Sequence, residues 1–339
     1  MSLKVVIFGG AGFIGSTLSS LLLEAGHHVV AVSRSAGERT SGHQRLKFLP
    51  ASVSDPAKVR DAVAGADVVF DLSMPFGALD WESWKSEVVD SAVHVAEACL
   101  AHGVRRLIYT SSISAIYLGG SATVTEQDGC DAKPASRGFY GRAKLEAEKA
   151  LLALHRSRGL PVVIHRPGIV LGPGGRLVHG AFGDAVNDVC VLGYGSGRHP
   201  LPCVLALDVA QALFLSITAP GIEGMTFNLA GDVRPTAAEY LRRIAAATHR
   251  PFRFIARPVW RIQTRELFIY FVKYVVRRGR VSFPPLRDFS SLAMSAPLDC
   301  SLAKKTLNWK PCADREEFFR QALLPHVMPL AEGDLRLEV

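Results

Sequence analysis

Short apolar runs alternate with longer amphipathic stretches through the first half of the chain. The runs are rich in β-branched residues and predict strands at Lys4–Phe8, Val29–Val32, Leu46–Leu49, Val68–Leu72, Arg106–Tyr109 and Val162–His165. Helical patterns lie between them, over Ser16–Ala25, Pro56–Ala64, Glu87–His102 and Tyr140–Arg158. Alternating strand and helix predicts parallel β-α-β units, and therefore an α/β, Rossmann-type, doubly wound parallel sheet.

The pattern changes after Gly172-Pro173-Gly174-Gly175. The rest of the chain contains one short predicted strand, at Met225–Leu229. Its predicted helices lie at Leu207–Thr218, Thr236–Thr248, Arg261–Val276 and Arg315–Leu323. We interpret this part as a smaller substrate lobe that closes over the strand ends, where open α/β sheets bind ligands. The prediction is a Rossmann-type sheet domain over residues 1–172 and a substrate-binding lobe over 173–339, with parts around 204–230 returning to the sheet.

Composition is that of a globular protein, with 339 residues, 48% of them hydrophobic and 21% charged. Six cysteines are scattered without Cys-x-x-Cys spacing, and the histidines show no ligand spacing. We therefore expect no metal site, and a reducing, cytoplasmic location is favoured. Glycines and Glu24 interrupt the apolar stretch that follows Lys4, which favours strand-turn-helix over a secretion signal.

The net charge of +8 is localised. Nine basic residues stand against the single acid Glu266 between Pro251 and Arg287, and nine minus one equals the net charge of the whole chain. The remainder is balanced, so we expect no nucleic-acid partner.

The same basic segment is also apolar between Trp260 and Arg280. It is too short and too charged to span a bilayer, which takes about 20 apolar residues. It could be a packed helix of the substrate lobe with snorkelling arginines, and Leu267, Tyr270, Phe271 and Tyr274 would form its core-facing stripe. The alternatives are an interfacial helix on anionic lipid, which makes peripheral membrane contact through residues 260–280, or a lid over an acidic or lipid-linked substrate.

A glycine motif follows the first strand and opens a helix, in the order Gly9-Gly10-Ala11-Gly12-Phe13-Ile14-Gly15. Glycine allows the tight turn, lets the backbone reach a pyrophosphate and brings helix and strand close, while the helix N-terminus favours the anion. This context predicts a dinucleotide-binding turn.

The end of the second strand carries no acid that could bond a ribose 2′-hydroxyl. It reads Ser33-Arg34-Ser35, and Arg34 offers a forked donor suited to a 2′-phosphate. We therefore expect NADP as the preferred cofactor, with NAD possible.

Tyr140 and Lys144 stand four residues apart and so share one face of the predicted helix. A free phenol has a pKa of about 10, and a nearby ammonium favours the phenolate and lowers that value. The hydroxyl-rich sequence Thr110-Ser111-Ser112 follows the fifth predicted strand.

Together these three motifs resemble the extended short-chain dehydrogenase/reductase family, which includes NAD-dependent epimerases, dehydratases and 3β-hydroxysteroid dehydrogenases. The resemblance implies that Tyr140 exchanges a proton with the substrate oxygen, that Lys144 also holds the nicotinamide ribose, and that Ser112 bonds the reacting oxygen, with Ser111 as the alternative. It implies a homodimer and cofactor contacts from Gly9, Gly12, Phe13, Ile14, Gly15, Ser33, Arg34, Ser35, Ser52, Val53, Leu72, Ser73, Met74, Thr110, Tyr140, Lys144, Pro167, Gly168, Ile169 and Val170.

Two departures from the family pattern bear on the substrate. Sugar-nucleotide enzymes of the family usually carry asparagine where this chain has Ile169 and arginine where it has Leu201. Both losses favour a less charged substrate, although Arg176 and Arg198 could compensate.

The predicted activity is hydride transfer between NAD(P) and a secondary alcohol or ketone of a small-molecule substrate. One alternative is an epimerase of an activated sugar in polysaccharide assembly; a dehydratase is disfavoured because the serine motif lacks a Thr-Asp-Glu-like set. A non-catalytic NADP-binding regulator is disfavoured because the chain keeps both Tyr140 and Lys144.

Overall fold

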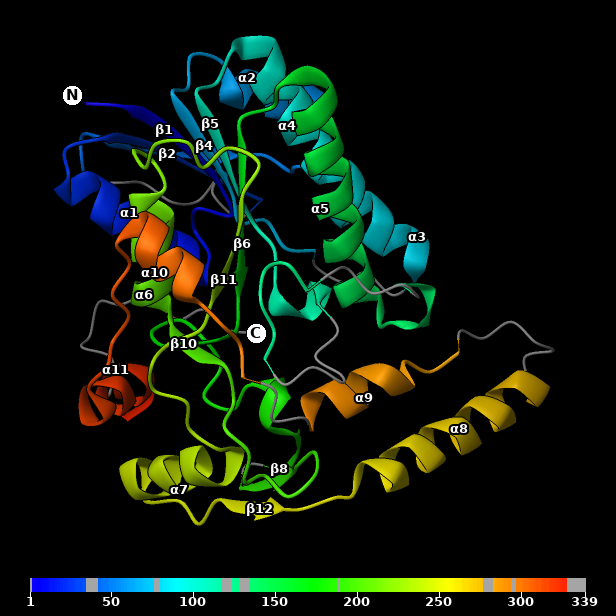
Figure 1. Ribbon diagram of the computed structural model, residues 1–339. Coiled ribbons are helices and arrows are strands. Elements are labelled where there is room, and N and C mark those ends of the chain that lie inside the picture. Colours follow the sequence, from blue (N-terminus) through cyan, green and yellow to red (C-terminus); the bar gives the residue numbers. More distant parts are fainter. Residues whose placement is uncertain are drawn as a thin grey trace.

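The computed structural model describes residues 2–34, 42–75, 80–116, 123–128, 134–187, 189–276, 283–293 and 297–327. A parallel sheet of seven strands forms its centre, in the order β11-β6-β5-β4-β1-β2-β3 (Figure 1). The strands are β1 (Lys4–Phe8), β2 (His28–Ser33), β3 (Leu46–Pro50), β4 (Val68–Asp71), β5 (Arg106–Thr110), β6 (Val162–Pro167) and β11 (Thr226–Leu229). The predicted α/β, doubly wound, Rossmann-type sheet is confirmed.

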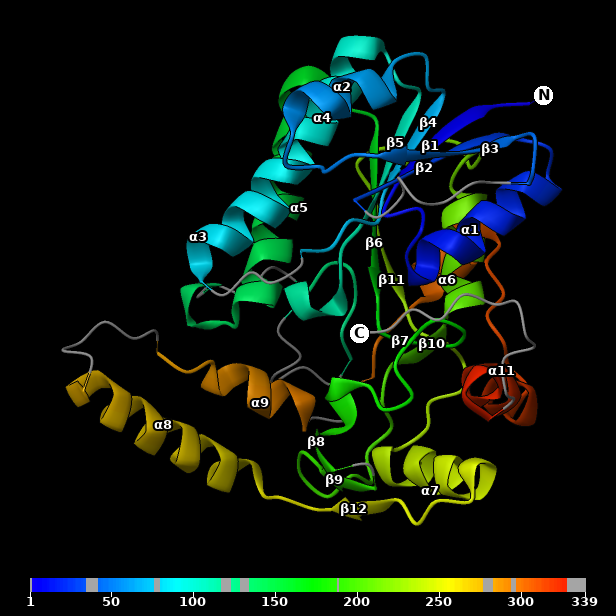
Figure 2. The same cartoon turned by 180° about the vertical axis from the view of Figure 1, so that it is seen from behind.

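Helices cover both faces of the sheet because successive strand residues point to opposite sides. In β1, Val5 and Ile7 pack into one core, while Val6 and Phe8 pack into the other. The first face carries α1 (Phe13–Glu24), α6 (Ala206–Leu215) and α10 (Ser301–Leu307), and the second carries α2 (Pro56–Val63), α4 (Ser91–His102) and α5 (Phe139–Arg158) (Figures 1 and 2).

One predicted helix differs from the observed structure. We expected a helix over Glu87–His102, whereas the structure has α3 (Trp81–Trp84), a π-helical turn η2 (Lys85–Asp90) and then α4. A π-helical turn bonds each carbonyl to the fifth residue onward, so it places one extra residue in the turn. The apolar periodicity of the sequence does not reveal this insertion.

The C-terminal part contributes two smaller sheets beside the carboxyl ends of the central strands. β7 (Ile169–Leu171) pairs with β10 (Cys203–Leu205), and β8 (Asp184–Asn187), β9 (Cys190–Leu192) and β12 (Arg253–Ile255) form the other sheet. Around them lie α7 (Ala237–Thr248), α8 (Val259–Val276), α9 (Leu286–Leu292) and α11 (Arg315–Val327), with short 3₁₀ turns η3 (Ile113–Ala115), η4 (Pro134–Ser136) and η5 (Gly180–Phe182) elsewhere. β11 belongs to the central sheet, and the domain division at residue 172 stays a prediction.

The length and apolar character of the helices decide whether one of them could cross a membrane. Among the described residues, no helix is both long enough and apolar enough to cross a bilayer.

Candidate active site

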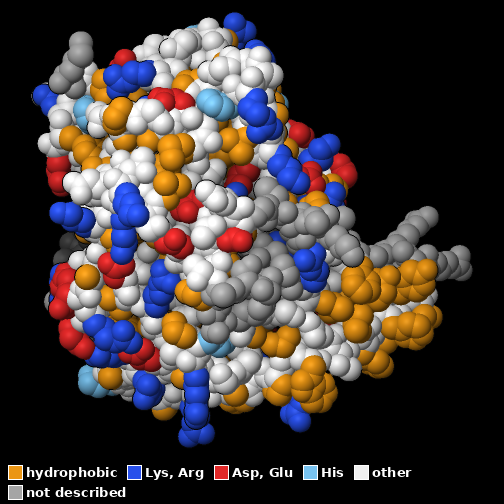
Figure 3. Space-filling view, viewed as in Figure 1, with side chains coloured by type: hydrophobic (Ala, Val, Ile, Leu, Met, Phe, Trp, Pro, Cys, Tyr) orange, Lys and Arg blue, Asp and Glu red, His pale blue; other side chains and the backbone are white. Residues whose placement is uncertain are grey.

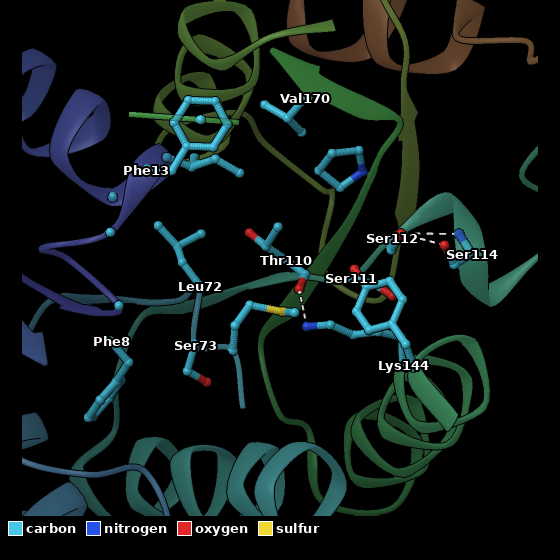
Figure 4. A pocket seen from close by; sticks show the side chains of 18 of the residues that line it. Phe8, Phe13, Leu72, Ser73, Thr110, Ser111, Ser112, Ser114, Lys144 and Val170 are labelled. Atoms are coloured by element: carbon cyan, nitrogen blue, oxygen red, sulfur yellow. Dashed lines mark hydrogen bonds between the residues drawn. The ribbon is translucent and has the colours of Figure 1, made fainter. Parts of the chain in front are cut away.

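A cavity of about 1310 Å³ lies at the carboxyl ends of the central strands. The predicted site residues of the described ranges all line it, from the glycine turn through Ser112, Tyr140 and Lys144 to the segment that begins at Pro167 (Figure 4). Ser35 lies outside the described residues. The strand order reverses beside β1, so this is the crevice at which open α/β sheets bind ligands.

The glycine turn after β1 is shaped by close backbone approaches. A side-chain carbon at Gly15 would lie 2.2 Å from the Gly9 carbonyl oxygen, and one at Gly9, whose φ is +78°, would lie 2.8 Å from the Leu72 carbonyl oxygen. Both positions therefore require glycine. They hold the N-terminus of α1 against the end of β4 and leave backbone N–H groups at the cavity for an anion.

Three buried hydroxyls at the cavity have no hydrogen-bond partner among the described residues. They belong to Ser33 at the end of β2 and to Thr110 and Ser111 at the end of β5. Buried polar groups are nearly always paired, so these hydroxyls are suited to bonding a polar ligand. Arg34, which follows Ser33, also lines the cavity, and the set fits an extended, phosphate-bearing dinucleotide.

Lys144 is buried at the wall of the cavity, with 2% of its surface exposed. Its Nζ donates to the Thr110 carbonyl oxygen at 2.9 Å and to the Tyr109 hydroxyl at 3.4 Å (Figure 4 shows the first bond). Burial lowers the pKa of Lys144 to about 8, against the opposing charges of Asp71 and Glu148.

Tyr140 and Ser112 meet at the same wall. Burial raises the pKa of Tyr140, and a hydrogen bond with the Ser112 side chain opposes this rise. We expected Lys144 to lower the pKa of Tyr140. The pKa is raised instead, because the ammonium of Lys144 points toward Thr110 and Tyr109. The phenol of Tyr140 therefore keeps its proton at neutral pH.

The start of α5 approaches the serine turn closely. A side-chain carbon at Gly141 would lie 2.6 Å from the Ser114 carbonyl oxygen, so glycine between Tyr140 and Lys144 lets the helix lie against η3. The Ser112 hydroxyl donates to the Ser114 hydroxyl at 3.2 Å, which orients it within that turn (Figure 4).

Asp288 of α9 holds this junction from the C-terminal part of the chain. Its carboxylate accepts from Nε of Arg137 and from the Gly138 amide, while Arg137 donates to the Ser114 carbonyl oxygen at 2.9 Å. Sequence reasoning missed both residues, because nothing in the local sequence connects Asp288 with the start of α5.

Other residues that line the cavity were also missed. The π-helical turn η2 brings Glu87 to the wall, the loop after β7 brings His179, and α9 brings Ser291 and Leu292. Glu87 was hidden by the unrecognised π-helical turn. Its carboxylate adds negative charge to a site that is otherwise lined by hydroxyls, cations and apolar groups.

The two positions that depart from sugar-nucleotide enzymes make this wall apolar. Ile169 and Leu201 line the cavity and are 6% and 5% exposed. Arg176 lines the cavity as well, whereas the exposed Arg198 is not among the lining residues. Of the two arginines that could compensate for the missing polar groups, Arg176 is therefore at the cavity and Arg198 is not among its lining residues.

A comparison with protein families identifies the class of this chain. A model of the NAD dependent epimerase/dehydratase family matches residues 5–230. The chain belongs to this family, which confirms the resemblance to extended short-chain dehydrogenases/reductases. It is accordingly an enzyme of an NAD-dependent family.

The relatives include both reductases and epimerases. The chain is 30% identical to 2-alkyl-3-oxoalkanoate reductase of Stenotrophomonas maltophilia (strain K279a) over 64% of its own length and 66% of the reductase's. It is 25% identical to UDP-glucose 4-epimerase of Vibrio cholerae over 95% of its length and 94% of the epimerase's. The crystal structure of gox2253 superimposes on this chain with a TM-score of 0.77 at 20% identity. The match covers 95% of this chain and 97% of the gox2253 chain, which shows that the two share a fold.

Proposed function

We propose that this protein is an NADP-preferring oxidoreductase that reduces a ketone to a secondary alcohol. The observation that supports the proposal best is the meeting of Ser112, Tyr140 and Lys144 at one wall of the cavity, opposite the glycine turn.

The proton chemistry follows from the states of these side chains. The Ser112 hydroxyl, which donates to the Ser114 hydroxyl in this structure, would turn to donate its hydrogen bond to the carbonyl oxygen of the substrate and position it beside Tyr140. Because burial raises its pKa, the phenol of Tyr140 holds the proton that this oxygen takes up during reduction. In this structure the ammonium of Lys144 is bonded to the Thr110 carbonyl oxygen, so it would have to turn toward Tyr140 to stabilise the phenolate that remains until water returns the proton.

A reduced nicotinamide dinucleotide held by the glycine turn would supply a hydride to the carbonyl carbon. The ketone gains one hydride at carbon and one proton at oxygen and becomes an alcohol. Gly9, Gly12 and Gly15 would face the pyrophosphate, and the buried hydroxyls of Thr110 and Ser111 would face the nicotinamide end.

The NADP preference is supported by the end of β2. Arg34 and the buried Ser33 hydroxyl both line the cavity there, and no acid takes the position that favours NAD. A guanidinium and a hydroxyl are donors suited to a 2′-phosphate.

The apolar wall indicates the substrate class. Ile169, Leu201 and Leu292 line the same cavity as the catalytic groups, so an oxo compound with an apolar chain would bury that chain against them. The similarity to a 2-alkyl-3-oxoalkanoate reductase points the same way.

A sugar-nucleotide epimerase is the second candidate. It is supported by the nearly full-length similarity to UDP-glucose 4-epimerase and by Arg176 at the cavity, which could bond a diphosphate. The apolar side chains of Ile169 and Leu201 speak against it, because a dianionic ligand needs charge-assisted bonds at that wall.

The cysteines bear on the cellular location of the protein. Cys99, Cys190, Cys203, Cys300 and Cys312 are free thiols in the described part of the chain. This supports a cytoplasmic protein.

Substrate screening with the Tyr140→Phe variant tests the proposal. The wild-type protein should oxidise NADPH with 3-oxo acids or esters that carry alkyl chains and should not interconvert UDP-glucose and UDP-galactose. Tyr140→Phe keeps the ring but loses the proton, so turnover should fall by roughly 10²–10⁴-fold while NADPH still binds.

Tyr194→Phe is the matched control, because this buried tyrosine bonds Asp184 and is not among the cavity residues. Its turnover should match the wild type. Near wild-type turnover in Tyr140→Phe would contradict the mechanism, and UDP-sugar interconversion without net NADPH oxidation would favour the epimerase.

A further inference from the structure

Helix α8 presents apolar side chains to solvent along its outer face. Trp260, Phe268, Phe271 and Val275 are 61%, 68%, 64% and 61% exposed. Their spacing of eight, three and four residues places them on one side of the helix. Figure 3 shows hydrophobic side chains gathered over α8, which extends from the body of the molecule in Figures 1 and 2.

The opposite side of α8 makes its contacts with the protein. Ile262 is the buried residue of this helix, and the Gln263 amide donates to the Leu286 carbonyl oxygen and the Ser290 hydroxyl of α9, both at 3.0 Å. Of the four residues that we considered as a core-facing stripe, Leu267, Phe271 and Tyr274 are 39%, 64% and 47% exposed. Tyr270 is partly buried, and its ring packs against Phe283. Only Tyr270 therefore agrees with the core-facing interpretation.

An apolar surface of this kind needs a partner. Monomeric soluble proteins rarely expose contiguous apolar patches beyond a few hundred Å², and larger ones mark interaction sites. The outer stripe of α8 consists mostly of aromatic side chains, the residues that anchor helices at the boundary between lipid headgroups and acyl chains.

The charge beside the stripe selects the kind of partner. Arg261 and Arg265 lie next to the stripe on α8, and the acid Glu266 is bonded to Arg265 at 2.8 Å. A twofold contact with a second copy would set this patch against itself and bring like charges together. An anionic surface is favoured by both the arginines and the aromatics.

We propose that α8 docks this protein on an anionic lipid bilayer as an interfacial helix. Trp260, Phe268, Phe271 and Val275 enter the headgroup region, and Arg261 and Arg265 bond lipid phosphates. α9 packs on α8 and contributes Ser291 and Leu292 to the cavity, so docking places one wall of the active site next to the membrane.

Vesicle co-sedimentation of the full chain tests this proposal. The protein should sediment with phosphatidylcholine vesicles that contain phosphatidylglycerol and should remain in solution with phosphatidylcholine alone. Binding should weaken between about 0.01 M and about 0.15 M salt, because the Debye length falls from roughly 30 to 8 Å.

Variants of α8 separate the two contributions. Phe268→Asp with Phe271→Asp should abolish binding, and Arg261→Gln with Arg265→Gln should weaken it by about fivefold for each charge removed, or roughly 1 kcal/mol each. Tryptophan emission should shift to shorter wavelength on vesicle addition, and Trp260→Phe should remove that shift.

Two matched controls alter similar residues elsewhere. Arg60→Gln with Arg156→Gln removes exposed charge on the far helices, and Val186→Asp alters a valine that is 60% exposed. Both should bind as the wild type does, and circular dichroism should show that all variants are folded.

Three outcomes would overturn the proposal. They are no sedimentation at low salt, equal binding by the Phe268→Asp/Phe271→Asp protein, and a dimer in sedimentation velocity that this double variant dissolves. The last would show that a second copy covers the stripe.

Discussion

At the scale of single residues, Lys144 is unusual because its charged ammonium group is buried. The Thr110 carbonyl and the Tyr109 hydroxyl bond it, and Asp71 and Glu148 lie close enough to favour its charge, yet burial still lowers its pKa to about 8. The charged form is thus less stable in the folded protein than in the unfolded chain.

This depressed pKa makes stability depend on pH. An exposed lysine titrates at about 10.4, so between about pH 8 and 10.4 the unfolded chain binds more protons than the folded protein. The contribution of Lys144 to the free energy of unfolding therefore rises with pH across that window. Lys144→Met should remove this rise.

Urea unfolding of both proteins at about pH 7.5 and about pH 9.5 measures the effect. The free energy of the wild type minus that of Lys144→Met should increase between the two pH values, since the other titrating groups are common to both. A difference that stays constant or decreases would show that Lys144 is not held with a depressed pKa.

Arg34 carries the cofactor prediction at the same scale. Arg34→Ala should weaken NADPH binding by roughly ten- to a hundredfold, the range expected for lost hydrogen bonds to a charged group, and leave NADH binding nearly unchanged. Fluorescence titration of both cofactors measures this. Arg60→Ala, in α2, is the control, and tighter binding of NADH than NADPH by the wild type would contradict the preference.

At the scale of elements, α5 is fixed to the sheet by a buried ion pair behind the catalytic residues. Arg166 of β6 donates to both carboxylate oxygens of Glu148, with Nε–Oε1 at 2.9 Å and Nη2–Oε2 at 2.6 Å, and the two side chains are 6% and 1% exposed. Glu148 lies one helical turn beyond Lys144, so the pair sets the rotation of the catalytic helix.

Removing one partner of this ion pair should lower the free energy of unfolding far more than removing both. Arg166→Met leaves the buried Glu148 carboxylate without the guanidinium that bonds it and should lower the free energy of unfolding by about 3–5 kcal/mol. Arg166→Met with Glu148→Leu should recover most of that loss. Chemical denaturation measures both, and equal destabilisation in the two proteins would contradict the assignment.

At the scale of the whole molecule, the contacts of Asp288 join the C-terminal part of the chain to the catalytic helix. Arg137 is 3% exposed at its side chain and bonds both Asp288 and the Ser114 carbonyl. The position of the serine turn therefore depends on α9, which also packs on α8.

Asp288→Asn should weaken this connection. It removes the negative charge that Arg137 bonds in α9, so we expect a loss of about 1–3 kcal/mol in the free energy of unfolding and a lower kcat with NADPH affinity unchanged. Glu239→Gln, which breaks an exposed ion pair with Arg315, is the control and should change little. A wild-type kcat in Asp288→Asn would exclude a positioning role.

Much of the central fold was predictable because its signals are local. The six strand predictions of the first half correspond to β1 to β6 within a few residues at their ends, since buried parallel strands are short, apolar and β-branched. Thr236 was predicted as part of a helix and is the cap of α7, where its hydroxyl accepts from the Glu239 amide. The missed elements, such as β8, β9 and α10, are short and have no clear period.

The sequence by itself determined the glycine turn, the shared helix face of Tyr140 and Lys144, and the basic apolar character of α8. Each depends on residues a few positions apart, whose relation follows from backbone geometry. Only the tertiary structure decided that Glu87, His179, Leu292 and Asp288 join the site, that Lys144 turns toward Thr110, and that the apolar stripe of α8 faces outward. These relations depend on long-range packing and on the burial it produces, which no local pattern encodes.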